Sequence, residues 1–106
     1  MRHLALALPV VLLLSACFPK SAVPPGPLSP EQIAREQSLR PAVSADELEQ
    51  GRKLFITECG RCHDHPDIQA IPLDRWPDIV GRMVGRTKLY AGARPMLMQF
   101  VEAVHN

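Results

Sequence analysis

The sequence predicts an all-α domain of three helices, on the evidence of helix-start signals and helical apolar spacing. Residues 44–106 contain three segments that open with a capping residue or a proline, the residue types that favour the start of a helix. In each segment apolar side chains recur every three or four positions, which places them on one buried face. At 106 residues the chain is long enough for one such domain.

The first predicted helix begins at Ser44, whose side chain forms a capping box with Glu47. The positions that follow share one helical face: Leu48, Gly51, Phe55 and Cys59. The helix therefore runs directly into the residues that follow Cys59.

The second predicted helix starts near Asp74, has Pro77 in its first turn and stops at Gly85. Its apolar face has the spacing i, i+3, i+4, i+7: Trp76, Ile79, Val80 and Met83. Met83 is accordingly expected to point toward the core.

The third predicted helix starts at Pro95 and runs nearly to the end of the chain. Its apolar stripe consists of Leu97, Phe100, Val101 and Val104. Phe100 is the expected partner of Gly51 where the first and third helices cross.

Five consecutive residues, Cys59-Gly60-Arg61-Cys62-His63, carry the strongest chemical signal in the chain. This spacing is typical of covalent c-type haem attachment, in which both thiols form thioethers with the haem vinyl groups and the histidine binds the iron. Two other uses of the cysteine pair remain open. The pair could hold half of a zinc site, for which few further ligands are at hand, or it could form a disulfide, which leaves the histidine without a role.

The chain resembles small monohaem c-type cytochromes of the class I type. The order Gly51, Phe55, Cys59 is similar to their first helix, and the segment from Trp76 to Met83 is similar to a helix that carries the axial methionine in some of them. The resemblance implies a three-helix fold wrapped around one covalent haem c. It also implies attachment through Cys59 and Cys62, and iron ligation by His63 and Met83. Met96 is the reserve ligand.

The residues between His63 and the second helix are expected to form a loop. His65 is predicted to be a solvated residue of this loop. Pro72 resembles the proline of the cytochrome pocket whose carbonyl accepts a hydrogen bond from the iron-binding histidine.

The amino terminus predicts export and lipidation. A short basic start precedes an apolar run over 4–14, which is too short to span a membrane. The sequence Leu14-Ser15-Ala16-Cys17 resembles the bacterial lipoprotein box, so residues 1–16 are expected to be a signal peptide and Cys17 the lipidated amino terminus. An ordinary signal peptide that leaves Cys17 as a free thiol is the alternative.

Residues 17–43 are predicted to be a proline-rich tether between the anchor and the cytochrome domain, 44–106. As a coil the tether would span about 30 Å, and fully extended up to about 80 Å. Ser29 and Gln32 form a capping box around Pro30, which predicts a short helix over 30–39. Its apolar face is thin, so marginal order is expected.

The resemblance implies a membrane-tethered electron carrier on the periplasmic side of a bacterial membrane, with redox proteins as partners. Phe18 after the lipidated cysteine is compatible with the outer membrane. The net charge of +1 gives no reason to expect nucleic-acid binding, and without a recognisable catalytic triad, phosphate loop or carboxylate pair we do not expect an enzyme. Two alternatives remain: a haem enzyme or gas-sensing subunit with an open axial position, and a non-haem structural lipoprotein.

Overall fold

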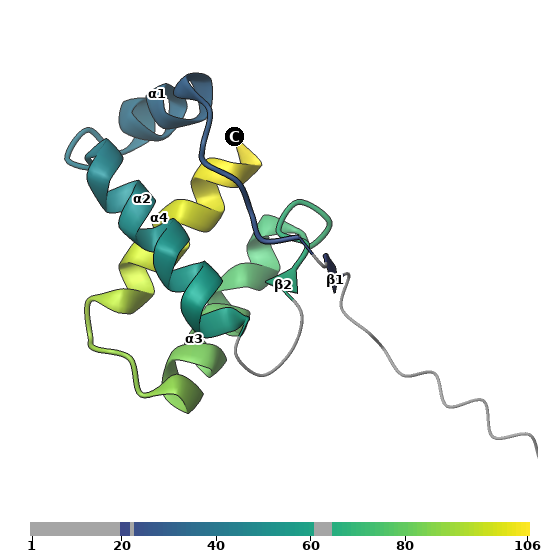
Figure 1. Ribbon diagram of the computed structural model, residues 1–106. Coiled ribbons are helices and arrows are strands. Elements are labelled where there is room, and N and C mark those ends of the chain that lie inside the picture. Colours follow the sequence, from purple (N-terminus) through teal and green to yellow (C-terminus); the bar gives the residue numbers. More distant parts are fainter. Residues whose placement is uncertain (1–19, 22, 61–64) are drawn as a thin grey trace, which may run out of the picture.

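The structure, a computed structural model, describes residues 20–21, 23–60 and 65–106. It contains helices α1 (Pro30–Leu39), α2 (Ala45–Leu54), α3 (Trp76–Thr87) and α4 (Ala93–His105). The shorter elements are a π-helical turn η1 (Phe55–Cys59), a 3-10 turn η2 (Leu73–Arg75) and two paired strands, β1 (Lys20–Ser21) and β2 (His65–Pro66) (Figure 1). The predicted all-α class is confirmed for the described residues. Cys17, Cys62 and His63 lie outside them, as does the predicted signal peptide.

Helix α2 begins as its capping box predicts. The Ser44 hydroxyl accepts a hydrogen bond from the Glu47 N–H at 3.1 Å, and a Glu47 carboxylate oxygen accepts one from the Ser44 N–H at 3.2 Å. These two bonds satisfy N–H groups that have no partner within the helix. The helix then passes into η1, which ends at Cys59.

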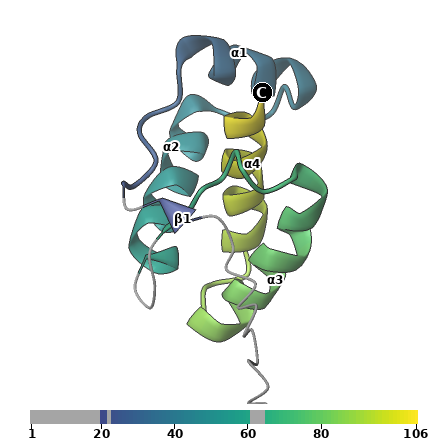
Figure 2. The same cartoon turned by 90° about the vertical axis from the view of Figure 1, so that its right-hand side faces the viewer.

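The crossing of α2 and α4 sets the arrangement of the domain. Figure 1 shows the two helices crossing at the middle of the molecule, and Figure 2 shows them side by side. Gly51 lies at the contact, where an added Cβ atom would sit 2.5 Å from the Met96 carbonyl oxygen and 2.9 Å from Phe100 Cβ. No larger residue fits there without movement, so the predicted pairing of Gly51 with Phe100 is confirmed.

Three aromatic side chains form the centre of the core. The Phe55 ring centroid lies 6.0 Å from that of Trp76 and 5.8 Å from that of Phe100, and both pairs are tilted by 57°. Tilted pairs at this separation are favourable because a ring edge faces a neighbouring π surface. The predicted apolar faces of α3 and α4 line the same core with Ile79, Val80, Leu97 and Val101.

Three helix boundaries differ from those expected. Gly85 lies inside α3, which continues to Thr87. The next residue, Lys88, caps the helix and has a left-handed conformation with a φ of 55°. Helix α3 also starts from η2 and not from a cap at Asp74. Helix α4 starts at Ala93, so Pro95 lies within its first turn, where an N–H has no intrahelical partner to lose.

Helix α1 has the expected bounds and a complete capping box, but its packing differs from the expectation. Instead of extending from the domain inside a free tether, α1 lies across the end of α4 (Figure 2). Leu28 and Ile33 pack against a small buried cluster of Val43, Leu48 and Ala103. The thin apolar face predicts marginal order only if no partner covers it, and here α2 and α4 cover it.

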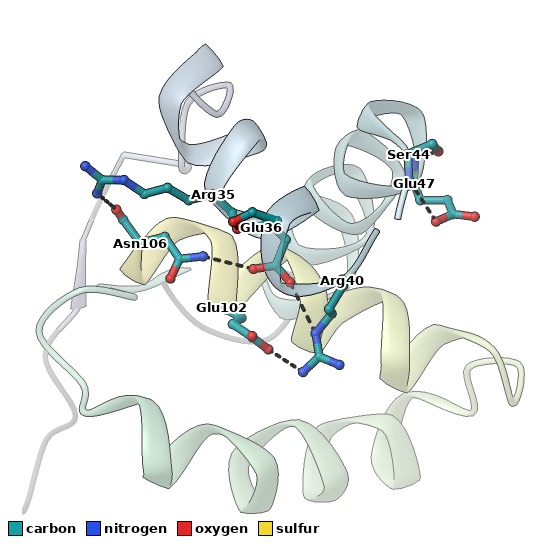
Figure 3. A network of polar contacts seen from close by, with 8 residues as sticks. Arg35, Glu36, Arg40, Ser44, Glu47, Glu102 and Asn106 are labelled. Carbon is teal, nitrogen blue, oxygen red and sulfur yellow. Dashed lines mark hydrogen bonds and ion pairs between the residues drawn. The ribbon is translucent and has the colours of Figure 1, made fainter. Parts of the chain in front are cut away.

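A buried carboxylate, Glu36, takes part in the polar contacts between α1 and the end of α4. Glu36 is fully buried, and its Oε2 accepts a hydrogen bond from Asn106 Nδ2 at 2.9 Å. Its other oxygen, Oε1, lies 3.3 Å from Arg40 Nε, and the same guanidinium donates to Glu102 Oε2 at 2.8 Å (Figure 3). Burial raises the pKa of Glu36, and the nearby charge of Glu102 acts in the same direction.

The close crossing predicts opposite effects for two glycine substitutions. Gly51→Ala should destabilise the protein by about 1–3 kcal/mol because the added methyl group overpacks the contact with Met96 and Phe100. Gly85→Ala is the matched control, since nothing lies within 4 Å of the position of its Cβ. It should stabilise α3 by about 0.5–1 kcal/mol through helix propensity. Urea unfolding measures both, and equal effects would contradict the crossing.

The raised pKa of Glu36 predicts a pH-dependent contribution to stability. The protonated side chain is favoured in the folded state, so its contribution is complete below the unfolded-state value of about 4.5 and is lost as the pH rises through the folded-state value. The stability advantage of the parent is its unfolding free energy minus that of the Glu36→Gln variant. This advantage should fall as the pH rises from below 4.5. Glu31→Gln, which removes an exposed charge from α1, controls for net charge. A difference that grows with pH would refute the assignment.

Candidate haem-attachment site

Cys59 and Gly60 are the described residues of the CxxCH motif, and Cys59 lies at the end of η1 against the core. Its side chain is half-buried beside the cluster that contains Phe55 and Trp76. Burial raises the pKa of the Cys59 thiol to about 11, and the neighbouring Glu58 carboxylate adds to the shift. Cys59 is therefore a neutral thiol at neutral pH, directed at an apolar surface.

The π-helical turn changes the path of the chain just before the motif. A π turn closes its hydrogen bonds over five residues, and such turns are frequent at functional sites. Phe55 opens the turn and Cys59 closes it, and both contact the same core cluster. The turn thus places Cys59, the first cysteine of the motif, at the edge of the core.

His65 differs from the solvated residue that the sequence predicts. Its ring stacks on Phe55 with centroids 6.1 Å apart and planes inclined by 23°. The ring also covers Gly60, where an added Cβ would lie 2.8 Å from His65 Nε2. Its Nδ1 is buried and has no hydrogen-bond partner. A histidine therefore covers the glycine of the motif, a position for which sequence spacing gave no signal.

Trp76, the first residue of α3, forms hydrogen bonds with the loop that follows the motif. Its indole N–H donates to the carbonyl oxygens of Ile68 and Ile71, both at 3.3 Å. The carbonyl of Pro72, for which the resemblance implies a bond with the iron-binding histidine, accepts a hydrogen bond from the Arg75 N–H at 3.0 Å. In the structure this carbonyl thus serves the turn that starts α3, whereas His63 lies outside the described residues.

The two candidate methionines have different surroundings. Met83 lies on α3 one turn beyond Ile79 and Val80, half-buried against the core cluster that Cys59 also contacts. Met96 lies in the first turn of α4, where its sulfur accepts a hydrogen bond from the exposed Tyr90 hydroxyl at 3.7 Å. Of the two, Met83 packs with the residues expected around a haem.

The described residues around Cys59 are mainly apolar and aromatic. Cys59, Phe55, Trp76 and Met83 present sulfur, aromatic and thioether surfaces to one cluster. Among the described residues, no group of three or more His, Cys, Asp or Glu side chains gathers as a metal site.

An open hollow of about 270 Å³ lies elsewhere, between the segment at Pro25–Pro27 and the loop at Pro66–Gln69. Neither Cys59 nor Met83 lines it. We therefore do not assign the candidate chemistry to this hollow.

In the part of the chain that the structure describes, no helix has the length and apolarity needed to cross a membrane.

Comparisons of the chain with protein-family models, with curated proteins and with solved structures gave no match.

Proposed function

We propose that this chain is an electron carrier that holds one covalent haem c and is tethered by lipid to the periplasmic side of a bacterial membrane. The observation that carries the proposal is the sequence Cys59-Gly60-Arg61-Cys62-His63. The position of Cys59 at the edge of an aromatic core supports it, since a haem needs apolar walls on both faces. Cys17 is the proposed site of lipidation.

The proposal gives a task to each of the candidate site residues and to two aromatic residues of the core. Cys59, together with Cys62, holds the haem through thioether bonds, and Phe55 and Trp76 exclude water from its surroundings. Met83 and His63 would be the two side chains that bind the iron. When bound, the haem iron supplies a one-electron exchange between its ferrous and ferric states. Because a neutral thioether favours the ferrous state, Met83 raises the potential at which that exchange occurs.

The two alternatives differ from the carrier at a single point each. A haem enzyme or gas-sensing subunit keeps the haem but leaves the sixth position open, so Met83 would be only a core residue. A structural lipoprotein has no haem, so the CxxCH motif would have no iron chemistry. The half-buried position of Met83 on the cluster that Cys59 contacts agrees with the carrier, and carbon monoxide binding separates the carrier from the open-site alternative.

The haem is expected to be covalent and necessary for folding. Domains of this size bury little apolar surface and commonly need an additional stabilising cross-link. Two thioether bonds and two iron–ligand bonds would provide it. Haem should remain with the exported chain after acid-acetone extraction. The double variant Cys59→Ala, Cys62→Ala should lose the haem and its cooperative thermal transition in circular dichroism. Cys17→Ser, which leaves the motif intact, should keep both. A well-folded double variant would refute the prediction.

Met83 and Met96 should respond differently to substitution. Met83→Ala should abolish the sulfur-to-ferric-iron charge-transfer band, lower the reduction potential and allow carbon monoxide to bind, because the sixth ligand is gone. Met96→Ala should leave all three unchanged, since its sulfur bonds to Tyr90 at the surface. Absorption spectroscopy and redox titration measure these properties. The reverse pattern would assign the ligand role to Met96.

A further inference from the structure

The amino-terminal segment runs back along the domain, although its proline content predicts a free tether. Strand β1 pairs with β2 in antiparallel register, with Lys20 opposite Pro66 and Ser21 opposite His65. Figure 1 shows this pair at one edge of the domain. Strand β2 contacts η1, so the pair places the amino-terminal segment near Cys59, the last residue of η1.

Two further contacts hold the same segment between β1 and α1. Arg52 on α2 donates from Nη1 to the Pro25 carbonyl oxygen at 3.1 Å. The Arg52 guanidinium is oriented for this by a two-point pair with Glu49, with N···O distances of 2.8 and 2.7 Å. Leu28 packs against both buried clusters of the domain. We call the segment formed by residues 20, 21 and 23–28 the strap.

The strap shortens the reach of the proposed lipid anchor. A free tether over 17–43 would let the domain turn in any direction, with a span of about 30 Å as a coil. With the strap docked, three residue steps separate Cys17 from Lys20, which reach at most about 11 Å. A lipid on Cys17 therefore brings the bilayer close to β1, β2 and the turn at 67–70.

We propose that the strap turns this edge of the domain toward the bilayer, so that the end of η1 at Cys59, which lies against β2, faces a redox protein embedded in the same membrane. This inference rests on the proposed function. The length of the free segment argues for such a partner, since about 11 Å of chain leaves little room between this edge and the membrane surface for a soluble protein. In Figure 1, β1 lies at the right-hand edge of the domain and α1 at its upper left, so α1 would lie farther from the bilayer than β1 does.

Spin labels at two exposed positions test the orientation. Ala70→Cys places a nitroxide label in the turn after β2, and Ser38→Cys places the control label in the last turn of α1. The lipidated holoprotein is inserted into vesicles whose headgroups chelate Ni²⁺, which speeds the relaxation of nearby nitroxides. The parent chain, treated with the same reagent, measures any label on native cysteines. Cys17→Ser, which lacks the anchor, gives the baseline.

The docked strap predicts strong relaxation enhancement at position 70 and weak enhancement at position 38. A ten-residue Gly/Ser spacer inserted directly after Cys17 should reduce this difference. If the strap is docked, the free anchor is three residues long, and the spacer increases its root-mean-square span about twofold. If the whole tether of 26 residues is free, the same spacer increases the span only about 1.2-fold. Equal enhancement at both positions in the unmodified anchor would overturn the inference.

A separate measurement on the same preparations tests the proposed function. Acid-acetone extraction shows whether haem is covalently attached, and extractable or absent haem would overturn the electron-carrier proposal. The relaxation pattern still decides whether the strap orients the domain in that case, because the Ni²⁺ readout does not depend on haem.

Discussion

The close approach of α2 and α4 at Gly51 is the constraint on which the rest of the structure depends. A side chain at this position would meet the Met96 carbonyl and Phe100, so the absence of one allows the two helix backbones to touch. The contact brings Phe55, one turn further along the chain, against Phe100 and Trp76. Helix α3 is then held by Trp76, and η1 delivers Cys59 to the edge of the same cluster.

The candidate site therefore depends on packing that begins outside it. Cys59 and Met83 come from separate elements, and each contacts the aromatic cluster without serving as its centre. His65 reaches the same cluster through its contact with Phe55, and the bonds from Trp76 to Ile68 and Ile71 hold the intervening loop. A change at the crossing should consequently alter the surroundings of both proposed sulfur positions, even though Gly51 has no chemistry of its own.

Local signals in the sequence predicted the parts of the fold that depend on neighbouring residues. The capping boxes at Ser29 and Ser44 marked helix starts because each involves residues three positions apart. The docking of α1 could not be predicted in this way, because Glu36 meets Asn106, 70 positions away. The end of α3 was misplaced because Lys88 takes the left-handed conformation that usually favours glycine. The stacking of His65 on Phe55 likewise depends on tertiary contact alone.

The absorption spectrum of the exported protein, reduced and then exposed to carbon monoxide, tests the central claim most directly. An iron ligated on both faces should give a split low-spin spectrum that does not change when carbon monoxide is added. A spectral shift would contradict the carrier by revealing an open axial position. Complete absence of haem bands would contradict haem attachment itself and leave the chain as a structural lipoprotein.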